Sequence, residues 1–412
     1  MSSRVSQDSS EASSEDGSEE GVVLTEGHRT AGSAPVDYAE ATRSVVDAVV
    51  SPLAADVDRL GRFPRAGVDA LAGAGLLGLI SAPEVGGGGR GLAAAAHVVE
   101  EVAASCGSTA AVLQMHYAAT TVIEAHGPEE VRRAIARGRH LTTLAFSEAG
   151  SRSHFWAPVG TARRDGATVV LDADKSWVTS AGEADSYVWS SPPLEADGAM
   201  TLWLVPGAAA GLRVTGGFDG LGLRGNASSP VSGRGVRVPL GAMLGADGTG
   251  LDTALATALP VFLVLSAAAC LGTMEAALGR AGNHLLTTGL DHLGEPLAHQ
   301  PSRRARYAEL RTRADGVRTF LADTVAALET GRADATQRVL QVKAVAAEAA
   351  CEVTDGVMRL CGGAAFRREL GVERPFRDSL AARVMAPTTE ALHDFVGRIA
   401  LGLPLFGGEV RA

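Results

Sequence analysis

The chain of 412 residues has few cysteines, few aromatic residues and no excess of basic charge. Its four cysteines lie far apart and form no Cys-x-x-Cys pair, which argues against a disulfide framework and a zinc motif and predicts reduced cytosolic thiols. We therefore predict no metal site. The formal net charge of −10 argues against nucleic-acid binding, because phosphate recognition needs a basic face.

The sequence also shows no signal peptide and no clear apolar run of about 20 residues, so we expect a cytoplasmic protein that does not span a membrane. Hydrophobic residues make up 46% of the chain, enough for a large core. Residues 1–34 are rich in Ser, Glu, Asp and Gly with few large apolar side chains. Such a segment cannot offset its ordering entropy, so we expect a disordered acidic tail.

Helical periodicity begins after this tail and defines an N-terminal helical domain, residues 35–139. The glycine-rich segment 86–89 is predicted to be a loop and not a dinucleotide fingerprint, because it does not sit in a βαβ unit. Residues 140–240 have the strand and turn signals of a middle β domain. Within them, Asp165-Gly166 separates two β-rich runs, 159–162 and 168–172, and predicts a hairpin.

Residues 241–412 return to helical periodicity and are predicted to form a helical bundle. The expected helices there cover about 251–281, 303–330, 334–361 and 379–401, the last disturbed at Pro387. Helices, then strands, then helices indicate an α+β fold with a β domain between two helical domains.

The segment from Leu144 to Asp185 carries the most specific signal in the chain. Its Ala149-Gly150-Ser151 turn offers small side chains and backbone N–H groups suited to binding an anion or amide. Trp177 and Thr179 follow in a strand, where an indole and a hydroxyl could contact a flat heterocycle. The alternative on these residues alone is an ordinary sheet core with a buried tryptophan.

The order of the parts, with four short motifs, resembles the acyl-CoA dehydrogenase family of flavoproteins over about residues 36–406. The motifs are the Gly-Leu-Leu to Gly-Gly segment 75–89, Ser-Glu-Ala-Gly-Ser at 147–151, Lys-Ser-Trp-Val-Thr with Ala-Asp at 175–185, and Gly-Gly with Arg-Asp at 362–378. The resemblance implies a helical N-terminal domain, a β-barrel-like middle domain and a C-terminal four-helix bundle. It also implies FAD between the last two, and a homodimer or homotetramer that shares its cofactor sites.

Carried over residue by residue, the resemblance implies a set of flavin-binding residues. Phe146 and Ser147 would flank the flavin pyrimidine and Ser151 would lie near the pyrophosphate. Trp177 would pack beside the isoalloxazine ring and Thr179 would hydrogen-bond near its N5 atom. The backbone at Gly362 and Gly363 would approach the cofactor of a neighbouring subunit, because glycine has no Cβ in the way.

The chain departs from the family where the catalytic base is expected. Ala386 takes the place of the usual Glu in the last helix, and the alternative position on the long buried helix is Phe262. Neither side chain can accept a proton. Two further departures near the cofactor are Arg152 in place of an acid, and Leu-Asp-His-Leu-Gly at 290–294 in place of the Arg-x-x-Phe-Gly segment.

Three side chains are candidates for proton chemistry. Glu390 follows Ala386 by four residues and would share its helical face if Pro387 does not break the helix. His393 follows three residues later, and His116 faces a part of the fold that lines the substrate pocket in relatives. The alternative without a catalytic role is that Glu390 is a solvent-exposed charge on a helix and that the two histidines are ordinary core or pocket-wall residues.

Three functions are consistent with this sequence. The first is an FAD-dependent oxidoreductase acting on an acyl thioester or related small molecule through a non-standard base, with Glu390 as the first candidate and an electron acceptor that the sequence does not name. The second is a two-component monooxygenase using reduced flavin or FMN from a separate reductase, with His393 and His116 near the reactive edge. The third is a flavin-binding relative without catalysis.

Overall fold

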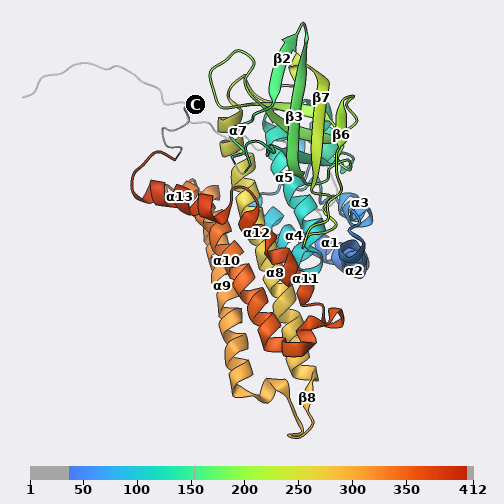
Figure 1. Cartoon of the computed structure of the whole chain (residues 1–412), viewed down its shortest axis with the longest axis vertical. Helices are drawn as coiled ribbons and strands as arrows, with labels where there is room; N and C mark the ends of the chain where they lie inside the picture. Colours follow the sequence, from blue (N-terminus) through green and yellow to red (C-terminus); the bar gives the residue numbers. More distant parts are fainter. Residues whose placement is uncertain (1–36, 153, 406–412) are drawn as a thin grey trace, which may run out of the picture. The chain divides into compact units, whose positions relative to one another are not determined.

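The computed structural model of the protein describes residues 37–152 and 154–405. It confirms the predicted α+β fold, in which helices lead into two β-sheets and then into a helical bundle (Figure 1). The predicted disordered tail, residues 1–34, lies outside the described residues.

The N-terminal helices pack their apolar faces together. They are α1 (Tyr38–Val45), a π-helical turn (Val46–Val50), α2 (Ser51–Leu60), α3 (Arg65–Gly73), α4 (Leu92–Ser105), α5 (Gly107–His126) and α6 (Glu129–Ala136). The Asp37 carboxylate accepts hydrogen bonds from the backbone N–H groups of Ala39 and Glu40, which caps α1 at its first turn. The helix α5 is buried along most of its length because apolar and small residues surround it on all sides.

The middle of the chain forms two sheets. The first has the order β1-β4-β5, with β1 (Thr142–Ala145) parallel to β4 (Ser186–Ser191) and β4 antiparallel to β5 (Thr201–Pro206). The second is antiparallel and has the order β2-β3-β7-β6, from β2 (Thr161–Asp165), β3 (Thr168–Val178), β7 (Ser229–Pro239) and β6 (Leu212–Val214).

The hairpin predicted at Asp165-Gly166 is confirmed, since Asp165 pairs with Thr168 and Gly166 has φ of 62°. The two runs expected at 168–172 and 177–179 belong together, because β3 continues from Thr168 to Val178 with shifts in register against β7. Such shifts bend a strand and re-aim its side chains.

The described C-terminal part of the chain combines three long helices with four short ones. They are α7 (Gly250–Ala256), α8 (Ala258–Thr287), α9 (Pro301–Glu329), α10 (Ala335–Cys361), α11 (Glu373–Ser379), α12 (Ala381–Val384) and α13 (Thr389–Ala400). A short hairpin of β8 (Gly289–Leu290) and β9 (Glu295–Pro296) joins α8 to α9. Short 3₁₀ turns cover Pro83–Val85, Leu240–Ala242, Leu297–His299, Gly362–Phe366 and Arg368–Leu370.

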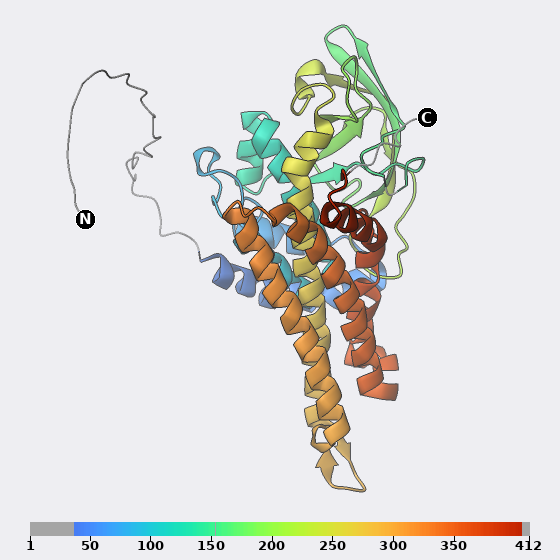
Figure 2. The ribbon, with the colours of Figure 1, turned by 90° about the vertical axis from the view of Figure 1, so that its left-hand side faces the viewer.

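The helix α8 is the centre of the bundle and contacts α4, α5, α9 and α10 (Figure 2). Its approach to α4 depends on Gly272, where a Cβ would lie 2.1 Å from the Glu100 carbonyl oxygen. By length and composition α8 could cross a membrane, so the sequence expectation of no such apolar run is wrong. However, 78% of its most apolar window is buried inside the protein, as in a core helix.

The last predicted helix, 379–401, is divided. The structure ends α12 at Val384 and begins α13 at Thr389, with the Thr388 hydroxyl capping α13 through the Ala391 N–H at 3.3 Å. The helix is interrupted around Pro387, so the condition for a shared helical face is not met, and Ala386 and Glu390 do not lie on one.

Candidate active site

The Ser-Glu-Ala-Gly-Ser motif follows β1 and turns sharply beneath aromatic side chains. Phe146 is buried, and its ring lies 6.4 Å from that of Phe155 in a stacked arrangement. Ser147 is half-buried and its carbonyl accepts the Ser176 N–H at 2.9 Å. The Ser151 hydroxyl is buried without a hydrogen-bond partner among the described residues. Since buried hydroxyls are nearly always paired, this group is suited to contact a molecule outside the chain.

Glu148 of the first β-domain motif and Lys175 of the second form a buried ion pair. The Lys175 ammonium donates to Glu148 Oε1 at 2.7 Å, to the Ser190 carbonyl at 2.7 Å and to the Ser190 hydroxyl at 2.9 Å. The second oxygen of Glu148 accepts the N–H groups of Val159 and Gly160, both at 2.8 Å. Burial lowers the pKa of Lys175 to about 8, and the charge of Glu148 opposes that shift.

The two motif residues therefore clamp the signature turn to β3 and have a structural function. The sequence alone suggested no role for either of them. A lysine at an inward-facing position of an apolar strand was the signal that could have found the pair, because a buried lysine requires a partner.

Trp177 lies at the end of β3 and points outward. Its side chain is 71% exposed, so the alternative of a sheet core with this tryptophan buried is wrong. Its φ is 56°, in the left-handed region that bulky residues rarely adopt. Thr179, expected in the same strand, lies in the turn just after β3 and is buried. The Ser180 hydroxyl is a second buried group at this edge without a partner in the described part of the chain.

Backbone strain gathers along this edge of the β domain. In the described ranges, the non-glycine residues with positive φ all lie between residues 152 and 227: Arg152, Trp177, Ser180, Leu223 and Ala227. Two backbone hydrogen bonds hold the strained segments together, from the Ser180 N–H to the Asn226 carbonyl and from the Ala181 N–H to the Ala227 carbonyl. Each strained residue costs roughly 1–3 kcal/mol, and such strain concentrates at functional sites.

A small cavity lies between α5, α8 and the segment around α12. Its volume is about 30 Å³, room for one or two water-sized groups. The lining residues are Gly107, Ala111, Gln114, Leu223, Ser266, Ala269, Cys270, Thr273, Asp378, Ser379, Ala382 and Met385. The Gln114 side-chain amide donates to the Ser266 hydroxyl at 2.7 Å, which joins α5 to α8 beside the cavity.

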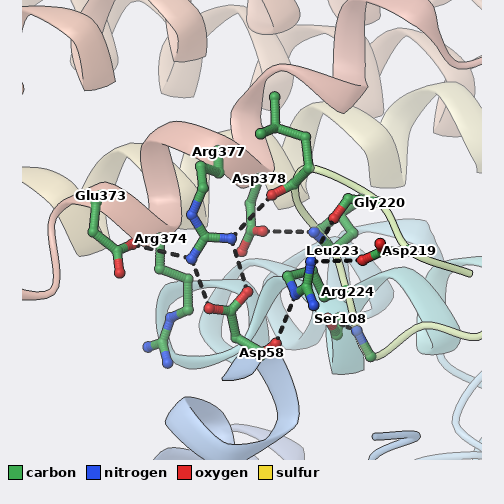
Figure 3. Close-up of polar contacts among 12 residues, drawn as sticks. Asp58, Ser108, Asp219, Gly220, Leu223, Arg224, Glu373, Arg374, Arg377 and Asp378 are labelled. Carbon is green, nitrogen blue, oxygen red and sulfur yellow. Dashed lines mark hydrogen bonds and ion pairs between the residues drawn. The ribbon is translucent and has the colours of Figure 1, made fainter. Parts of the chain in front are cut away.

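The Arg-Asp signature pins the β domain to both sets of helices (Figure 3). Arg377 makes a two-pronged ion pair with Asp58 of α2, at 2.9 and 2.6 Å, and donates to the Leu221 carbonyl at 3.0 Å. Asp378 accepts the Leu223 N–H at 2.6 Å. Full burial raises the pKa of Asp378 to about 6, which makes it a buried carboxyl that titrates near neutrality and lines the cavity.

His116 is fully buried with both ring nitrogens in use. Nε2 lies 3.1 Å from the Leu77 carbonyl, and Nδ1 accepts the Thr142 N–H at 3.2 Å. These contacts imply that Nε2 carries the proton. Burial lowers its pKa to about 4, so the ring is neutral at pH 7. It connects α5 to β1 and is not among the residues that line the cavity.

Glu390 and His393 are exposed on α13 and do not line the cavity. The backbone N–H of Glu390 itself and the Thr388 hydroxyl lower the pKa of Glu390, so this carboxylate is ionised at the start of the helix. Ala386 is half-buried and Phe262 is buried, and neither has a titratable group.

Aromatic side chains bring α13 against the β domain. The Phe155 ring lies 5.1 Å from that of Trp156, which lies 5.6 Å from that of Phe395 on α13. Phe155 also stacks on Phe146, so the chain of rings joins the signature turn to the helix that carries Glu390 and His393. Sequence periodicity gave no sign of this contact, which depends on tertiary packing.

Gly362 and Gly363 follow α10 and are exposed. Gly362 has φ of 60°, and a Cβ at either position would meet no other atom within 4 Å. Within one chain this turn is therefore open on its outer side.

Comparisons with known proteins agree with this geometry. Sequence models of the acyl-CoA dehydrogenase N-terminal, middle and C-terminal domains match residues 36–138, 143–236 and 248–401. The human mitochondrial short-chain specific acyl-CoA dehydrogenase is 28% identical, over 84% of this chain and 85% of its own. The cyclohex-1-ene-1-carbonyl-CoA dehydrogenase of Geobacter metallireducens is 27% identical, over 87% of this chain and 96% of its own.

Solved structures share the fold. The butyryl-CoA dehydrogenase of Megasphaera elsdenii has a TM-score of 0.84 at 21% identity, covering 91% of this chain and 100% of its own. FkbI, described for biosynthesis of the methoxymalonyl extender unit of the polyketide immunosuppressant Fk520, has a TM-score of 0.79 at 26% identity, covering 88% of this chain and 99% of its own. Three consecutive domain matches and a shared fold show that the chain belongs to the acyl-CoA dehydrogenase family of flavin-dependent oxidoreductases.

Proposed function

We propose that the protein oxidises a short acyl thioester, with bound FAD supplying the hydride acceptor. The observation that carries the proposal is the exposed indole of Trp177, fixed by a left-handed backbone at the strained edge of the β domain. An exposed aromatic ring held in this way is a preformed platform for a flat cofactor.

The residues at this edge fit a flavin. The buried hydroxyls of Ser151 and Ser180, which have no partner among the described residues, offer hydrogen bonds to a polar group from outside the chain. Phe146, Ser147, Ser151, Trp177 and Thr179 would hold the cofactor, as the family resemblance implies. The Lys175–Glu148 pair would keep these residues in place from behind.

The proposed substrate class comes from relatives and from the cavity. Two relatives of similar length carry the names short-chain specific acyl-CoA dehydrogenase and cyclohex-1-ene-1-carbonyl-CoA dehydrogenase. A cavity of about 30 Å³, narrowed by the Gln114–Ser266 hydrogen bond, favours an acyl group of few carbons. FkbI adds the possibility of a polar acyl unit, since it serves biosynthesis of a methoxymalonyl extender.

The proton acceptor in this proposal is a carboxylate other than the usual family glutamate. Glu390 is ionised on the helix that Phe395 fixes against Trp156, but it is exposed and does not line the cavity. Asp378 competes with it because it lines the cavity and has a pKa of about 6, near the value suited to a general base at neutral pH. Single substitutions at the two positions distinguish these candidates.

The monooxygenase alternative has less support. One of its two histidines, His116, uses both ring nitrogens in buried hydrogen bonds and has a pKa of about 4. A ring committed in this way has no free nitrogen for proton transfer to a bound molecule. The second, His393, is exposed on α13 and is not among the residues that line the cavity.

We extend the proposal to a homodimer or homotetramer in which the Gly362-Gly363 turn meets the flavin of a neighbouring subunit. The turn is open in the single chain, and Phe366 at the end of the same 3₁₀ turn is 91% exposed. An exposed phenylalanine beside such a turn is typical of a subunit interface. Light scattering coupled to gel filtration tests this, and a monomer at micromolar concentration would count against it.

The function is tested by the visible spectrum of the purified protein, followed by anaerobic addition of short acyl-CoA and acyl-carrier thioesters. We expect bound flavin whose absorbance is lost with at least one short thioester. A protein that takes up neither oxidised nor reduced flavin would overturn the proposal. A flavin that binds but is reduced by no thioester would favour a member of the family without this catalysis.

A further inference from the structure

Lys343 is a fully buried cation in α10 to which the proposed function assigns no role. Its ammonium donates to three backbone carbonyl oxygens: Ala382 at 3.0 Å, Met385 at 2.9 Å and Pro387 at 2.8 Å. A lysine ammonium has three N–H donors, so all of them are occupied by the chain itself.

The three carbonyls belong to the segment that ends α12 and leads into α13. Carbonyls at the end of a helix lack partners within the helix and need another donor. Lys343 satisfies these groups across the break between Val384 and Thr389. It therefore takes the place of the helical hydrogen bonds that the interruption removes.

This arrangement sets one wall of the cavity. Ala382 and Met385 both line the cavity, while their carbonyl oxygens are turned toward α10 by Lys343. Ala386 lies between two of the held carbonyls, at the position where the family usually has its catalytic glutamate. The side chains of this wall therefore face the cavity, while the carbonyl oxygens of Ala382 and Met385 point toward Lys343 on α10.

The charge of Lys343 is poorly compensated. Among the described residues no carboxylate forms an ion pair with it; Cys270 on α8 and the exposed Glu390 on α13 are its electrostatic neighbours. Burial lowers the pKa of Lys343 to about 8, and the same effect raises the pKa of the Cys270 thiol to about 12, so the thiol is neutral. Burying an ammonium is unfavourable, and the three carbonyl contacts are its direct compensation within the described residues.

We infer that Lys343 is a positioning residue that fixes the substrate-facing wall of the cavity, residues 382–387, by holding its carbonyl oxygens. The inference rests on the proposed function for its consequence in catalysis. Whether Lys343 keeps residues 382–387 closed over the cavity can be measured without catalysis.

Cys270 provides the measurement, because it lines the cavity and is only 5% exposed. The full-length wild type and the Lys343→Met variant are treated with iodoacetamide at neutral pH, and labelling is followed by peptide mass spectrometry. We expect Cys270 to react about tenfold faster in the variant, because local opening becomes easier by about 1.4 kcal/mol. Cys361, buried at the far end of α10, is the internal control and should not change.

Two further measurements separate positioning from general stability. Lys343→Arg keeps a charge and N–H donors and is expected to restore slow labelling of Cys270. The flavin-loaded Lys343→Met variant should retain its flavin, but a thioester should reduce that flavin more slowly than it reduces the flavin of the wild type. Unchanged labelling of Cys270, or an equal rise at Cys361, would overturn the inference. If no thioester reduces the wild type, the proposed function fails while the labelling result still decides the role of Lys343.

Discussion

The site has a β face, formed by the signature turn 147–151 and β3, and a bundle face, formed by α10 and residues 382–387. The two faces hold their buried lysines in different ways. On the β face, Lys175 is neutralised by Glu148, and the pair is completed by Ser190 and two backbone N–H groups. On the bundle face, Lys343 has three carbonyl oxygens and no ion-pair partner among the described residues. On the β face an ion pair fixes the signature turn. On the bundle face hydrogen bonds from Lys343 to carbonyl oxygens fix residues 382–387.

This difference follows the chemistry of the two faces. The β face keeps the residues that the family resemblance assigns to the flavin, and the Lys175–Glu148 ion pair ties their signature turn to β3. The bundle face has Ala386 and Phe262 where proton acceptors are expected. Under the proposed function, cofactor binding and proton transfer depend on separate parts of the chain, so substitutions should affect them separately.

The largest effect is expected from Lys175→Met on the β face. Removing the ammonium leaves the Glu148 carboxylate buried and uncompensated, which costs about 3–5 kcal/mol in the free energy of unfolding. Lys343→Met leaves three neutral carbonyls, each costing about 1–3 kcal/mol if it finds no other partner, but it also removes a buried charge that has no ion-pair partner among the described residues, so the net loss should be smaller. Urea unfolding of both variants measures the two losses.

The Glu148→Gln/Lys175→Met double variant is the control for this comparison. It should recover part of the stability lost in Lys175→Met, because no buried charge remains. Equal losses in Lys175→Met and Lys343→Met would remove the proposed difference between the two faces.

Glu390→Gln and Asp378→Asn identify the proton acceptor on the bundle face. The variant that lacks the true base should reduce its flavin with thioester about 10²–10⁴-fold more slowly, the usual contribution of a general base. If Asp378 is the base, the wild-type rate should rise as pH increases through about 6, where this carboxyl loses its proton at its pKa. Stopped-flow reduction from about pH 5 to 8 gives both results, and full rates in both variants would exclude both carboxylates.

Asp378 also predicts how stability depends on pH at the junction of the three domains. Its folded pKa of about 6 lies above the ordinary value of 3.8, so the folded state binds the proton more tightly than the unfolded state. The free energy of unfolding should therefore fall by up to about 3 kcal/mol as pH rises from about 4 to 6. Asp378→Asn should lack this component, because its amide does not titrate.

The measurement is the difference in unfolding free energy between wild type and Asp378→Asn at several pH values, in which the other titrating groups cancel. Asparagine can still accept the Leu223 N–H through its side-chain oxygen, so the junction is kept. A difference that stays constant across the range would show that the carboxyl titrates at an ordinary pKa.

Much of the fold can be predicted from the sequence because periodicity is local. The apolar residues of α8 and the Asp165-Gly166 turn are enough to predict a core helix and a hairpin. The division between Val384 and Thr389 is indicated only as a disturbance at Pro387. The resulting separation of Glu390 from the helical face of Ala386 is visible only in the folded chain.

The site is harder to predict because its decisive contacts join residues distant in sequence. Lys343 meets the Ala382 and Pro387 carbonyls, and Arg377 meets Asp58, with no local signal for either contact. His116 stands out by residue type, yet its type does not reveal that backbone groups occupy both ring nitrogens. Burial and partners, which decide what a polar residue does, are properties of the folded chain.

The smallest and most specific effect is expected at Trp177. Because its indole is 71% exposed, Trp177→Ala should change the stability of the flavin-free protein little, while weakening flavin binding about five- to tenfold, since ring contacts contribute about 1 kcal/mol. Thr179→Ala should weaken flavin binding or shift the flavin spectrum through the loss of one hydrogen bond. Flavin titration followed by absorbance measures both, and Trp177→Phe is the control that keeps an aromatic ring.

Trp177→Gly makes the test sharper. The φ of 56° costs tryptophan energy that glycine does not incur, so this variant should be more stable than Trp177→Ala without flavin and bind flavin no better. Stability and cofactor affinity would then change in opposite directions at one position. Unchanged flavin binding in Trp177→Ala and Trp177→Gly would separate this tryptophan from the flavin, whereas a Trp177→Gly variant no more stable than Trp177→Ala would contradict the backbone strain.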